Sequence, residues 1–373
     1  MTSTPRPLRV GLISANWGAK SHLPAWRAVP GVEVVAICTS REETARAAAD
    51  RHGIPRAVWD FKALAADPDI DLIDIGTRPL LRYEILKAAL SGGKHVYAGV
   101  PFTATLDQAE EVVALAERNG LIGASDAYFQ HIPAHAELGH RLRSGEIGQV
   151  LSVSAELQIN LFNPTQPDYP YFWFGEGANG ASALRNLGGH TITLLVSLLG
   201  QVEAVVGVED RKLAEWRAQD GVIYKPEVSD TASLLLQFSG GVIATLNLSW
   251  IDAGPIGWRL DVHGSTGRLT ARHPIGFPNH SHIELFSASP DVPTEAKAPL
   301  SDVFCHSPRV DISHDHRPLP CYPMALSFDC LKSAIEGRGE PAPSLKTALH
   351  VERVLAAAAR SARSRAWEPI PGQ

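Results

Sequence analysis

The chain has few cysteines, and none of them form a recognisable pair. Its 373 residues include only four cysteines, with no CxxC spacing among them. Cys38 stands in an apolar run, where a reduced and buried thiol is the common use of cysteine. The sequence therefore gives no indication of a secreted disulfide scaffold.

The chain also lacks an excess of positive charge and any long hydrophobic run. Its 34 lysines and arginines face 40 acidic residues, a formal net charge of −6, so no basic field is available for nucleic acid. No apolar run approaches the ~20 residues of a membrane span, and the stretch Val10 to Ala15 is too short for a signal-peptide core. We expect a cytoplasmic protein without a nucleic-acid or membrane partner.

The first third of the sequence has the pattern of a parallel sheet. Short runs rich in valine and isoleucine alternate with longer helical patterns, which is typical of strands joined by crossover helices. We therefore expect a Rossmann dinucleotide-binding domain over residues 1–127. Its expected strands are Arg9–Ser14, Glu33–Thr39, Leu72–Gly76, His95–Ala98 and Leu121–Ala124.

The pattern changes in the remainder of the chain. From Leu151 to Leu161 every odd position is apolar and every even one is polar, as in a strand with one buried face. Two hairpins are expected around the turns 239–241 and 264–267. Residues 128–373 are thus predicted to form an α+β domain on a large open antiparallel sheet. The fold class is α/β followed by α+β.

Residues 273–323 are unusually rich in proline and histidine. They hold nine of the 27 prolines and six of the 15 histidines, which favours a long ordered loop over helix or sheet. Zinc accepts histidine and cysteine ligands, but no spacing here matches an established zinc pattern, so no metal is expected. The residues weighed for that site are His280, His282, Cys305, His306, His314, His316 and Cys321.

The segment after the first strand stands where a glycine-rich GxGxxG fingerprint is expected. Most of its glycines are missing, although Ser14 and Asn16 are small polar residues that partly serve the same close approach to a pyrophosphate. We expect cofactor contacts from these two residues and from Trp17 and Gly18. A Rossmann-like domain that no longer binds a nucleotide stays open as an alternative.

The second expected strand ends without a carboxylate. An acidic residue there would bind the ribose 2′-hydroxyl of NAD, whereas Ser40 and Arg41 suit a 2′-phosphate through charge-assisted hydrogen bonds. NADP is therefore the expected cofactor, with NAD as a possibility. Alternatively, Ser40 caps the following helix and Arg41 is a solvated residue of its first turn.

Five short motifs follow one another along the chain: Thr77-Arg78-Pro79, Gly93 to Val96 before Pro101, Gly145 to Gly148, Gly188-Gly189-His190, and Gly264 to Gly267. In this order they resemble the glucose-fructose oxidoreductase and inositol dehydrogenase (Gfo/Idh/MocA) family. The resemblance covers nearly the whole chain. It implies pyridine-nucleotide redox chemistry at a carbinol, often of a sugar or polyol, with Thr77, Pro79 and Pro101 at the cofactor.

The departures from the family pattern concern proton transfer. Typical members carry Glu-Lys-Pro where this chain has Gly99-Val100-Pro101, and aspartates where Asn186 and Thr193 stand. A positioned acid or base is typically worth 10² to 10⁴ in rate, and Val100 cannot act as one. Of the usual catalytic set, only His190 remains.

His190 is therefore the expected catalytic residue, with Asn186 as a group that positions the substrate. His190 precedes the apolar stretch Thr191 to Leu199, so we expect its ring at the positive end of a helix, which favours a neutral imidazole. The glycines before it would let a ligand approach closely. A histidine used only for packing is the alternative.

Further substrate contacts are expected from aromatic and histidine side chains. His131 and Tyr128 follow the last expected strand of the parallel sheet, where ligands bind. Trp173 belongs to the aromatic run Tyr169 to Phe174, which suits either a stacking wall for a sugar or a packed core.

The resulting hypothesis is an NAD(P)-dependent oxidoreductase, with NADP preferred, acting on a small hydroxylated or carbonyl substrate. Two alternatives stay open: a nucleotide-binding regulator resembling the yeast galactose-pathway repressor, and a redox-neutral lyase that uses a bound nucleotide. A homodimer or homotetramer is expected, because an open sheet leaves one face uncovered.

Overall fold

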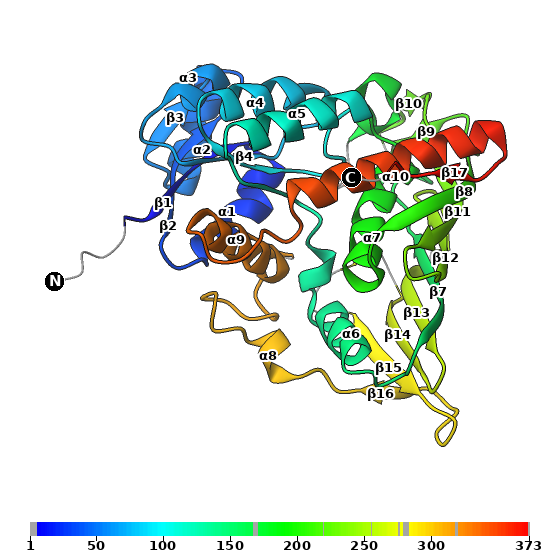
Figure 1. Ribbon diagram of the computed structural model, residues 1–373. Coiled ribbons are helices and arrows are strands. Elements are labelled where there is room, and N and C mark those ends of the chain that lie inside the picture. The colour runs from blue at the N-terminus through cyan, green and yellow to red at the C-terminus, as the bar shows by residue number, and fades with distance from the viewer. Residues whose placement is uncertain are drawn as a thin grey trace. The chain divides into compact units, whose positions relative to one another are not determined.

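The computed structural model describes residues 6–166, 171–218, 220–254, 256–274, 277–278, 283–317 and 320–371. The chain divides into two compact units (Figure 1). Unit 1 comprises residues 1–131 and 306–349, and unit 2 comprises residues 132–305 and 350–373. This differs from the expected cut after residue 127, because residues 306–349 return to unit 1. There, helix α9 (Cys321–Ile335) packs on α1 (Leu23–Arg27).

Unit 1 is built on a six-stranded parallel sheet of order β3-β2-β1-β4-β5-β6. The expected strands are all present, β5 with the expected ends and the others with ends shifted by at most two residues. The additional strand β3 was not expected, since it has only three residues and lies at the sheet edge. The strands are β1 (Leu8–Ile13), β2 (Val32–Cys38), β3 (Arg56–Val58), β4 (Leu72–Ile75), β5 (His95–Ala98) and β6 (Gly123–Ser125).

Helices cover both faces of this sheet. Isoleucines such as Ile13, Ile73 and Ile75 meet α3, α4 and α5, and the last two of these helices pack side by side (Figure 1). The opposite face places Leu12 and Ile37 against η1 and α2. The remaining elements of unit 1 are η1 (Gly18–His22), α2 (Glu42–His52), α3 (Phe61–Ala66), α4 (Pro79–Ser91), α5 (Leu106–Arg118) and η2 (Tyr128–His131).

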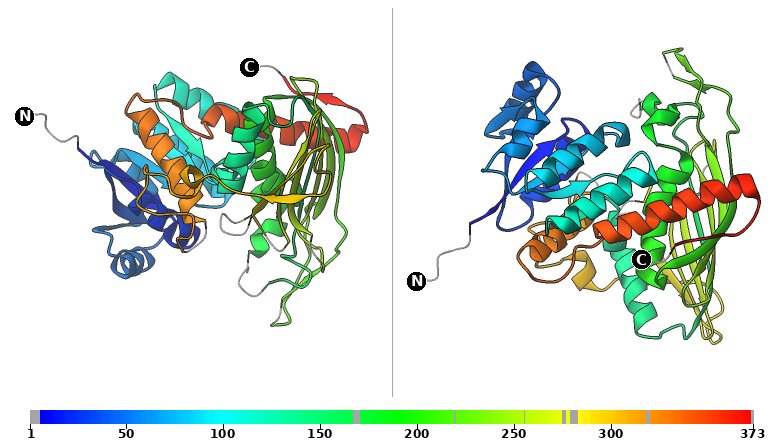
Figure 2. Two further views of the ribbon diagram at one scale, coloured as in Figure 1. Left: turned by 90° about the horizontal axis from the view of Figure 1, so that it is seen from below. Right: turned by 45° about the horizontal axis from the view of Figure 1, so that its top comes forward.

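Unit 2 contains a nine-stranded sheet of order β16-β15-β14-β13-β7-β12-β11-β8-β17, seen nearly edge-on in Figure 2, left. Neighbouring strands run antiparallel, as expected, except that β7 and β12 are parallel. Parallel neighbours need a long crossover, and the connection between these two contains helix α7. The strands are β7 (Val150–Gln158), β8 (Val202–Asp210), β11 (Thr231–Phe238), β12 (Ile243–Ser249), β13 (Gly257–Gly264), β14 (Arg268–His273), β15 (Glu284–Ala288), β16 (Ala296–Ala298) and β17 (Glu368–Pro369).

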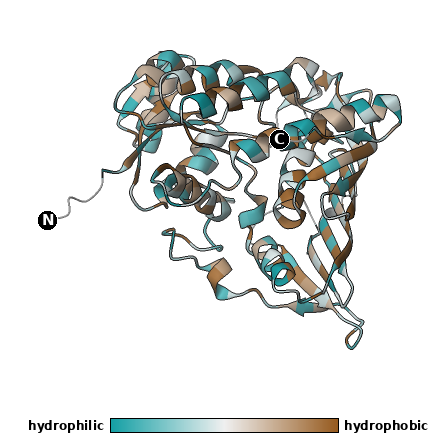
Figure 3. Ribbon diagram, viewed as in Figure 1, coloured by the Kyte–Doolittle hydropathy of each residue, from teal (hydrophilic) through white to brown (hydrophobic). Residues whose placement is uncertain are grey.

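The alternating pattern of the sequence matches the faces of this sheet. Val153, Ala155 and Leu157 of β7 are buried, and apolar and polar residues alternate along the strands in Figure 3. The two expected hairpins are β11–β12 and β13–β14. Helix α7 (Ala183–Leu199) packs on β7, β11 and β12. Unit 2 also contains α6 (Pro133–Arg143), η3 (Phe172–Gly175), η4 (Gly177–Asn179), β9 (Trp216–Arg217), β10 (Ile223–Tyr224) and α8 (Asp302–Cys305), and α10 (Leu345–Ser364) begins in unit 1 and ends in unit 2.

The expectation of an extended loop over 273–323 is partly wrong. Strands β15 and β16 extend the large sheet at its edge, and α8 follows them. These elements have only three to five residues each, so the surrounding prolines and histidines dominate the sequence pattern. No helix within the described ranges is long and apolar enough to cross a membrane.

Candidate functional site

The loop after β1 has the expected place for nucleotide binding and an unusual construction. The Ser14 Oγ accepts hydrogen bonds from the backbone N–H of Gly18 (3.2 Å) and of Asn16 (3.4 Å). A Cβ at Gly18 would lie 2.9 Å from the Ser14 Cβ, and one at Gly76 would lie 3.0 Å from it. The serine hydroxyl therefore closes the turn, and the close approach that requires glycine occurs at Gly18 and Gly76.

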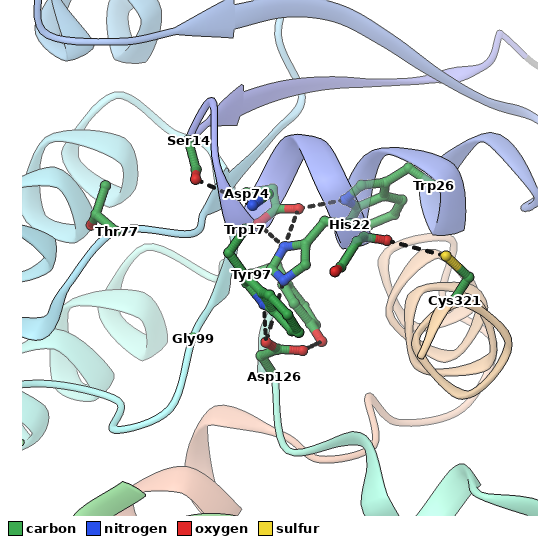
Figure 4. A network of polar contacts seen from close by, with 12 residues as sticks. Ser14, Trp17, His22, Trp26, Asp74, Thr77, Tyr97, Gly99, Asp126 and Cys321 are labelled. Carbon is green, nitrogen blue, oxygen red and sulfur yellow. Dashed lines mark hydrogen bonds and ion pairs between the residues drawn. The ribbon is translucent and has the colours of Figure 1, made fainter. Parts of the chain in front are cut away.

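The loop after β4 carries a buried hydroxyl next to this turn. Thr77 follows Gly76, and no hydrogen-bond partner among the described residues reaches its buried Oγ1. Figure 4 shows Thr77 and Ser14 on neighbouring loops. Buried polar groups are rarely left unsatisfied, so this hydroxyl is suited to a ligand that binds at the carboxyl ends of the strands. Pro79 begins α4 just beyond it.

One buried guanidinium ties this loop to the one after β5. The Arg82 Nη1 donates to the carbonyls of Gly99 (2.9 Å) and Phe102 (3.2 Å) and to that of Pro101. Its Nη2 donates to the carbonyl of Thr77. The segment that replaces Glu-Lys-Pro is therefore held by Arg82, a residue that was not among the expected site residues.

Ser40 and Arg41 are exposed at the carboxyl end of β2. Helix α2 has Arg41 as its N-cap residue, without a side-chain cap. The alternative in which Ser40 caps the helix is therefore wrong. The Thr39 Oγ1 lies 2.6 Å from the Thr44 Oγ1, so hydroxyls at neighbouring positions stabilise the start of α2.

A network of charged groups is buried behind the β1 loop (Figure 4). The His22 Nδ1 lies 2.9 Å from both carboxylate oxygens of Asp74, and its Nε2 lies 3.2 Å from the Asp126 Oδ2. The Trp26 Nε1–H donates to Asp74 (2.7 Å), and the Tyr97 O–H donates to Asp126 (2.8 Å). Both imidazole nitrogens thus face carboxylates. Burial by itself lowers the pKa of His22, but the charges of Asp74 and Asp126 raise it to about 10.

No local motif in the sequence reveals this network, although one feature points to it. Asp74 stands between Ile73 and Ile75 in a strand that is buried throughout. A carboxylate in such a position needs a partner, because an unpaired buried charge is very costly.

In unit 2, His190 lies in the middle of α7 and not at its start. The helix begins at Ala183, where the Ser182 Oγ accepts the N–H of Arg185 (3.1 Å). The predicted influence of the helix N-terminus on His190 is therefore wrong. Its half-buried imidazole packs edge-on against Phe277, with ring centroids 5.3 Å apart.

The residues around His190 mostly serve the helix. The Asn186 Oδ1, one turn earlier, accepts the backbone N–H of Ser182 (3.2 Å). The Thr193 Oγ1 donates to the Gly189 carbonyl (2.7 Å), so it takes no part in proton transfer. A Cβ at Gly188 would lie 3.2 Å from a methyl of Leu248. This glycine permits packing on the sheet, in contrast to the expected approach of a ligand.

The expected substrate residues in unit 1 are largely engaged within that unit. His131 has its Nε2 2.8 Å from the carbonyl of Ala342, and burial lowers its pKa to about 4. Tyr128 is buried beside Phe129. These environments disfavour substrate contact for both residues.

The aromatic run in unit 2 divides between core and surface. Phe174 is buried, with its ring parallel to that of Trp250 at 5.7 Å. Trp173 is partly exposed in η3 and meets Phe174 edge-on at 4.3 Å. Tyr169 lies outside the described residues. Trp173 therefore stays a candidate substrate contact.

Two of the histidines weighed for a metal site, His306 and His314, lie close together within the described residues. His280 and His282 lie outside the described residues. His306, His314 and Asp315 place one ligand atom each within 4.8 Å of one another, without His316. The thiols of Cys305 and Cys321 are buried, and Cys321 donates to the Ser21 carbonyl (3.6 Å).

Comparison with known families matches both parts of the chain. Residues 8–126 match the oxidoreductase family with an NAD-binding Rossmann fold, and residues 135–270 match the GFO/IDH/MocA C-terminal domain. The chain belongs to the GFO/IDH/MocA family. The family, fold class and oxidoreductase class expected from the motifs are therefore confirmed.

Several GFO/IDH/MocA proteins are similar over most of their length. The dTDP-3,4-didehydro-2,6-dideoxy-alpha-D-glucose 3-reductase of Actinomadura kijaniata is 31% identical over 70% of this chain and 74% of its own. The D-apiose dehydrogenase of Paraburkholderia graminis is 26% identical over 78% and 74%. The structure of a levoglucosan dehydrogenase in complex with NADH and levoglucosan has a TM-score of 0.85, with 22% identity over 98% of this chain and 99% of that one.

Proposed function

We propose that this GFO/IDH/MocA protein is an NADP-preferring oxidoreductase that interconverts a hydroxyl and a carbonyl group on a sugar or polyol. The observation that carries cofactor binding is the buried Thr77 hydroxyl, which has no partner among the described residues and stands beside the Ser14 turn. The named substrates of the relatives, which are sugars or sugar derivatives, support the substrate class.

The loops at the carboxyl ends of the unit 1 strands would bind the dinucleotide. Ser14, Asn16 and Gly18 shape the turn in which a pyrophosphate would lie, and Trp17 is exposed on the same turn. The loops that carry Thr77, Pro79 and Pro101 would border the cofactor, and Arg82 fixes two of them. When bound, a nicotinamide supplies the hydride chemistry. These residues bind and orient it.

The preference for NADP rests on the end of β2. Ser40 and Arg41 are exposed there, and no carboxylate occupies positions 39–41. A guanidinium binds a phosphate monoester through short charge-assisted hydrogen bonds. A carboxylate at this position would repel that phosphate, so its absence favours NADP further.

Proton transfer is assigned to His190, because Val100 has no titratable group. Oxidation of a carbinol releases the hydroxyl proton, which a neutral imidazole accepts. Reduction of the carbonyl requires the same group as the proton donor. The side-chain Oδ1 of Asn186 accepts the backbone N–H of Ser182. The side-chain NH₂ group of Asn186 is left to donate to a substrate hydroxyl.

The test has two stages. Calorimetry with NADP(H) and NAD(H) measures cofactor binding, and nicotinamide absorbance then follows turnover with a panel of sugars and polyols. We expect tighter binding of NADP(H) and turnover with at least one substrate. Binding without turnover across the whole panel would favour the regulator, and a product of unchanged oxidation state would favour the lyase.

A further inference from the structure

Trp17 joins the nucleotide-binding loop to the buried charge network. The indole is 41% exposed on the loop, yet its Nε1–H donates to the Asp126 Oδ2 at 3.3 Å. Figure 4 shows the tryptophan reaching from the loop toward this carboxylate. A large exposed side chain on a loop ordinarily samples several rotamers, whereas this one is tied at its polar end.

The carboxylate that accepts this hydrogen bond is itself fixed on both oxygens. The Asp126 Oδ1 accepts the hydroxyl of Tyr97, and the Oδ2 accepts both the indole N–H and the His22 Nε2–H. Two donors therefore converge on Oδ2. One oxygen accepts both donors, so removal of the carboxylate by Asp126→Ala breaks both bonds.

The far end of the network is anchored in the packing of unit 1. Asp74 receives the His22 Nδ1–H and the Trp26 indole N–H. Trp26 stacks on Phe328 of α9, with ring centroids 3.8 Å apart and planes 7° apart. From Phe328 to Trp17, the orientation of each side chain in the network is thus fixed by its contact with the neighbouring side chain.

We infer that His22, Asp74 and Asp126 are positioning residues that hold the Trp17 indole in one orientation before the cofactor binds. The inference rests on the proposed function, because it assigns the loop of Trp17 to the nucleotide. The entropic cost of ordering a side chain on binding is removed when the side chain is already ordered, so the network increases cofactor affinity. It acts on binding and leaves the chemical step unchanged.

Trp17→Phe is the first test, because it keeps an aromatic side chain but removes the indole N–H group, and the matched control below makes the same change in size. Trp59→Phe is a matched control: Trp59 is 43% exposed, also in unit 1, and its ring lies under the guanidinium of Arg46. We expect Trp17→Phe to raise the dissociation constant of NADP(H) by about two- to tenfold, the range set by ordering one side chain on binding, with kcat unchanged. Trp59→Phe should have no effect.

Two further variants separate positioning from general loss of structure. Asp126→Ala should weaken binding as much as Trp17→Phe, and the double variant should be no weaker than either, because both changes break the same bond. Tyr97→Phe removes the donor to the other oxygen of Asp126. It should lower the melting temperature and leave the dissociation constant within about twofold.

The possible outcomes distinguish failure of the proposed function from failure of this inference alone. Wild-type protein that binds neither nucleotide would overturn the proposed function and this inference together. Wild-type protein that binds, with Trp17→Phe equally tight, would overturn the inference alone. Additive losses in the double variant would also overturn it. If Asp126→Ala does not fold, the comparison of Trp17→Phe with Trp59→Phe still decides, since both sites are exposed.

Discussion

The guanidinium of Arg82 occupies the space that a side chain at residue 99 would need. A Cβ on Gly99 would lie 2.6 Å from the Arg82 Nη2, well inside van der Waals contact. The same nitrogen donates to the carbonyl of Thr77. Gly99 and Arg82 therefore depend on each other, and the absence of the family's Glu-Lys-Pro sequence accompanies a different way of holding the two loops.

This relationship predicts the effect of Gly99→Ala. The new methyl group must displace a guanidinium that bonds several carbonyls, so we expect a loss of about 1–3 kcal/mol in unfolding free energy. Denaturant unfolding measures it, and cofactor affinity should fall because the Thr77 loop moves. Gly240→Ala is the control, since a Cβ there meets nothing within 4 Å. Equal stability of the Gly99 variant and wild type would contradict the argument.

Arg41→Ala should abolish the preference for NADP. Removal of one charge-assisted contact to the 2′-phosphate predicts a loss of about 10- to 100-fold in NADP(H) affinity, with NAD(H) affinity unchanged. Arg51→Ala, at an exposed position near the other end of α2, is the control. Calorimetry with both cofactors measures the ratio. Equal affinities for the two cofactors in wild type would refute the assignment.

His190→Ala should lower turnover by about 10² to 10⁴ and leave cofactor affinity nearly intact, because a general base acts in the transition state. Steady-state kinetics on the substrate found by screening, combined with calorimetry, separates the two effects. Unchanged turnover in this variant would rule out His190 as the proton-transfer group.

The stability of the protein should fall as the pH rises above 6.5. The pKa of His22 is about 10 in the folded chain against 6.5 when unperturbed, so the folded state retains a proton that the unfolded state loses. The stabilisation is complete below pH 6.5 and is lost as the pH approaches 10. Urea unfolding of wild type and His22→Asn between pH 6.5 and 9 should show this slope only in wild type. The control variant His52→Asn, which changes a partly exposed histidine, should show the same dependence of stability on pH as wild type.

Self-association is expected through the face of the large sheet opposite α7. Val208, Leu235 and Ile243 are exposed on neighbouring strands β8, β11 and β12. We expect a dimer or tetramer by light scattering, against a chain mass of 40.2 kDa. Leu235→Glu should shift it toward monomer. Val222→Glu, in the exposed connection before β10, should not. A wild-type monomer at micromolar concentration would contradict the expectation.

Regular elements with local patterns were predictable from the sequence. The parallel strands follow from runs of valine and isoleucine, and β7 follows from strict alternation. The start of α7 was misplaced because Gly188 and Gly189 resemble a helix boundary. The helix nevertheless runs through them, since Gly188 allows close packing and Ser182 provides the cap.

The charge network could not be predicted from local pattern. His22 bonds Asp74 and Asp126, which are 52 and 104 residues away along the chain. Only the order of the strands brings these carboxylates to one histidine. The same holds for Arg82, whose acceptors lie on a loop up to 20 residues away.

The return of residues 306–349 to unit 1 affects the order in which the protein is completed during synthesis. The parallel sheet leaves the ribosome early, but Phe328, which stacks on Trp26, follows about three hundred residues later. Until then the indole of Trp26 lacks its aromatic cover, and the buried charges behind it lie closer to water. The amino-terminal part of unit 1 is thus synthesised first but receives its last packing contacts late. A fragment ending near residue 131 would therefore be an incomplete unit.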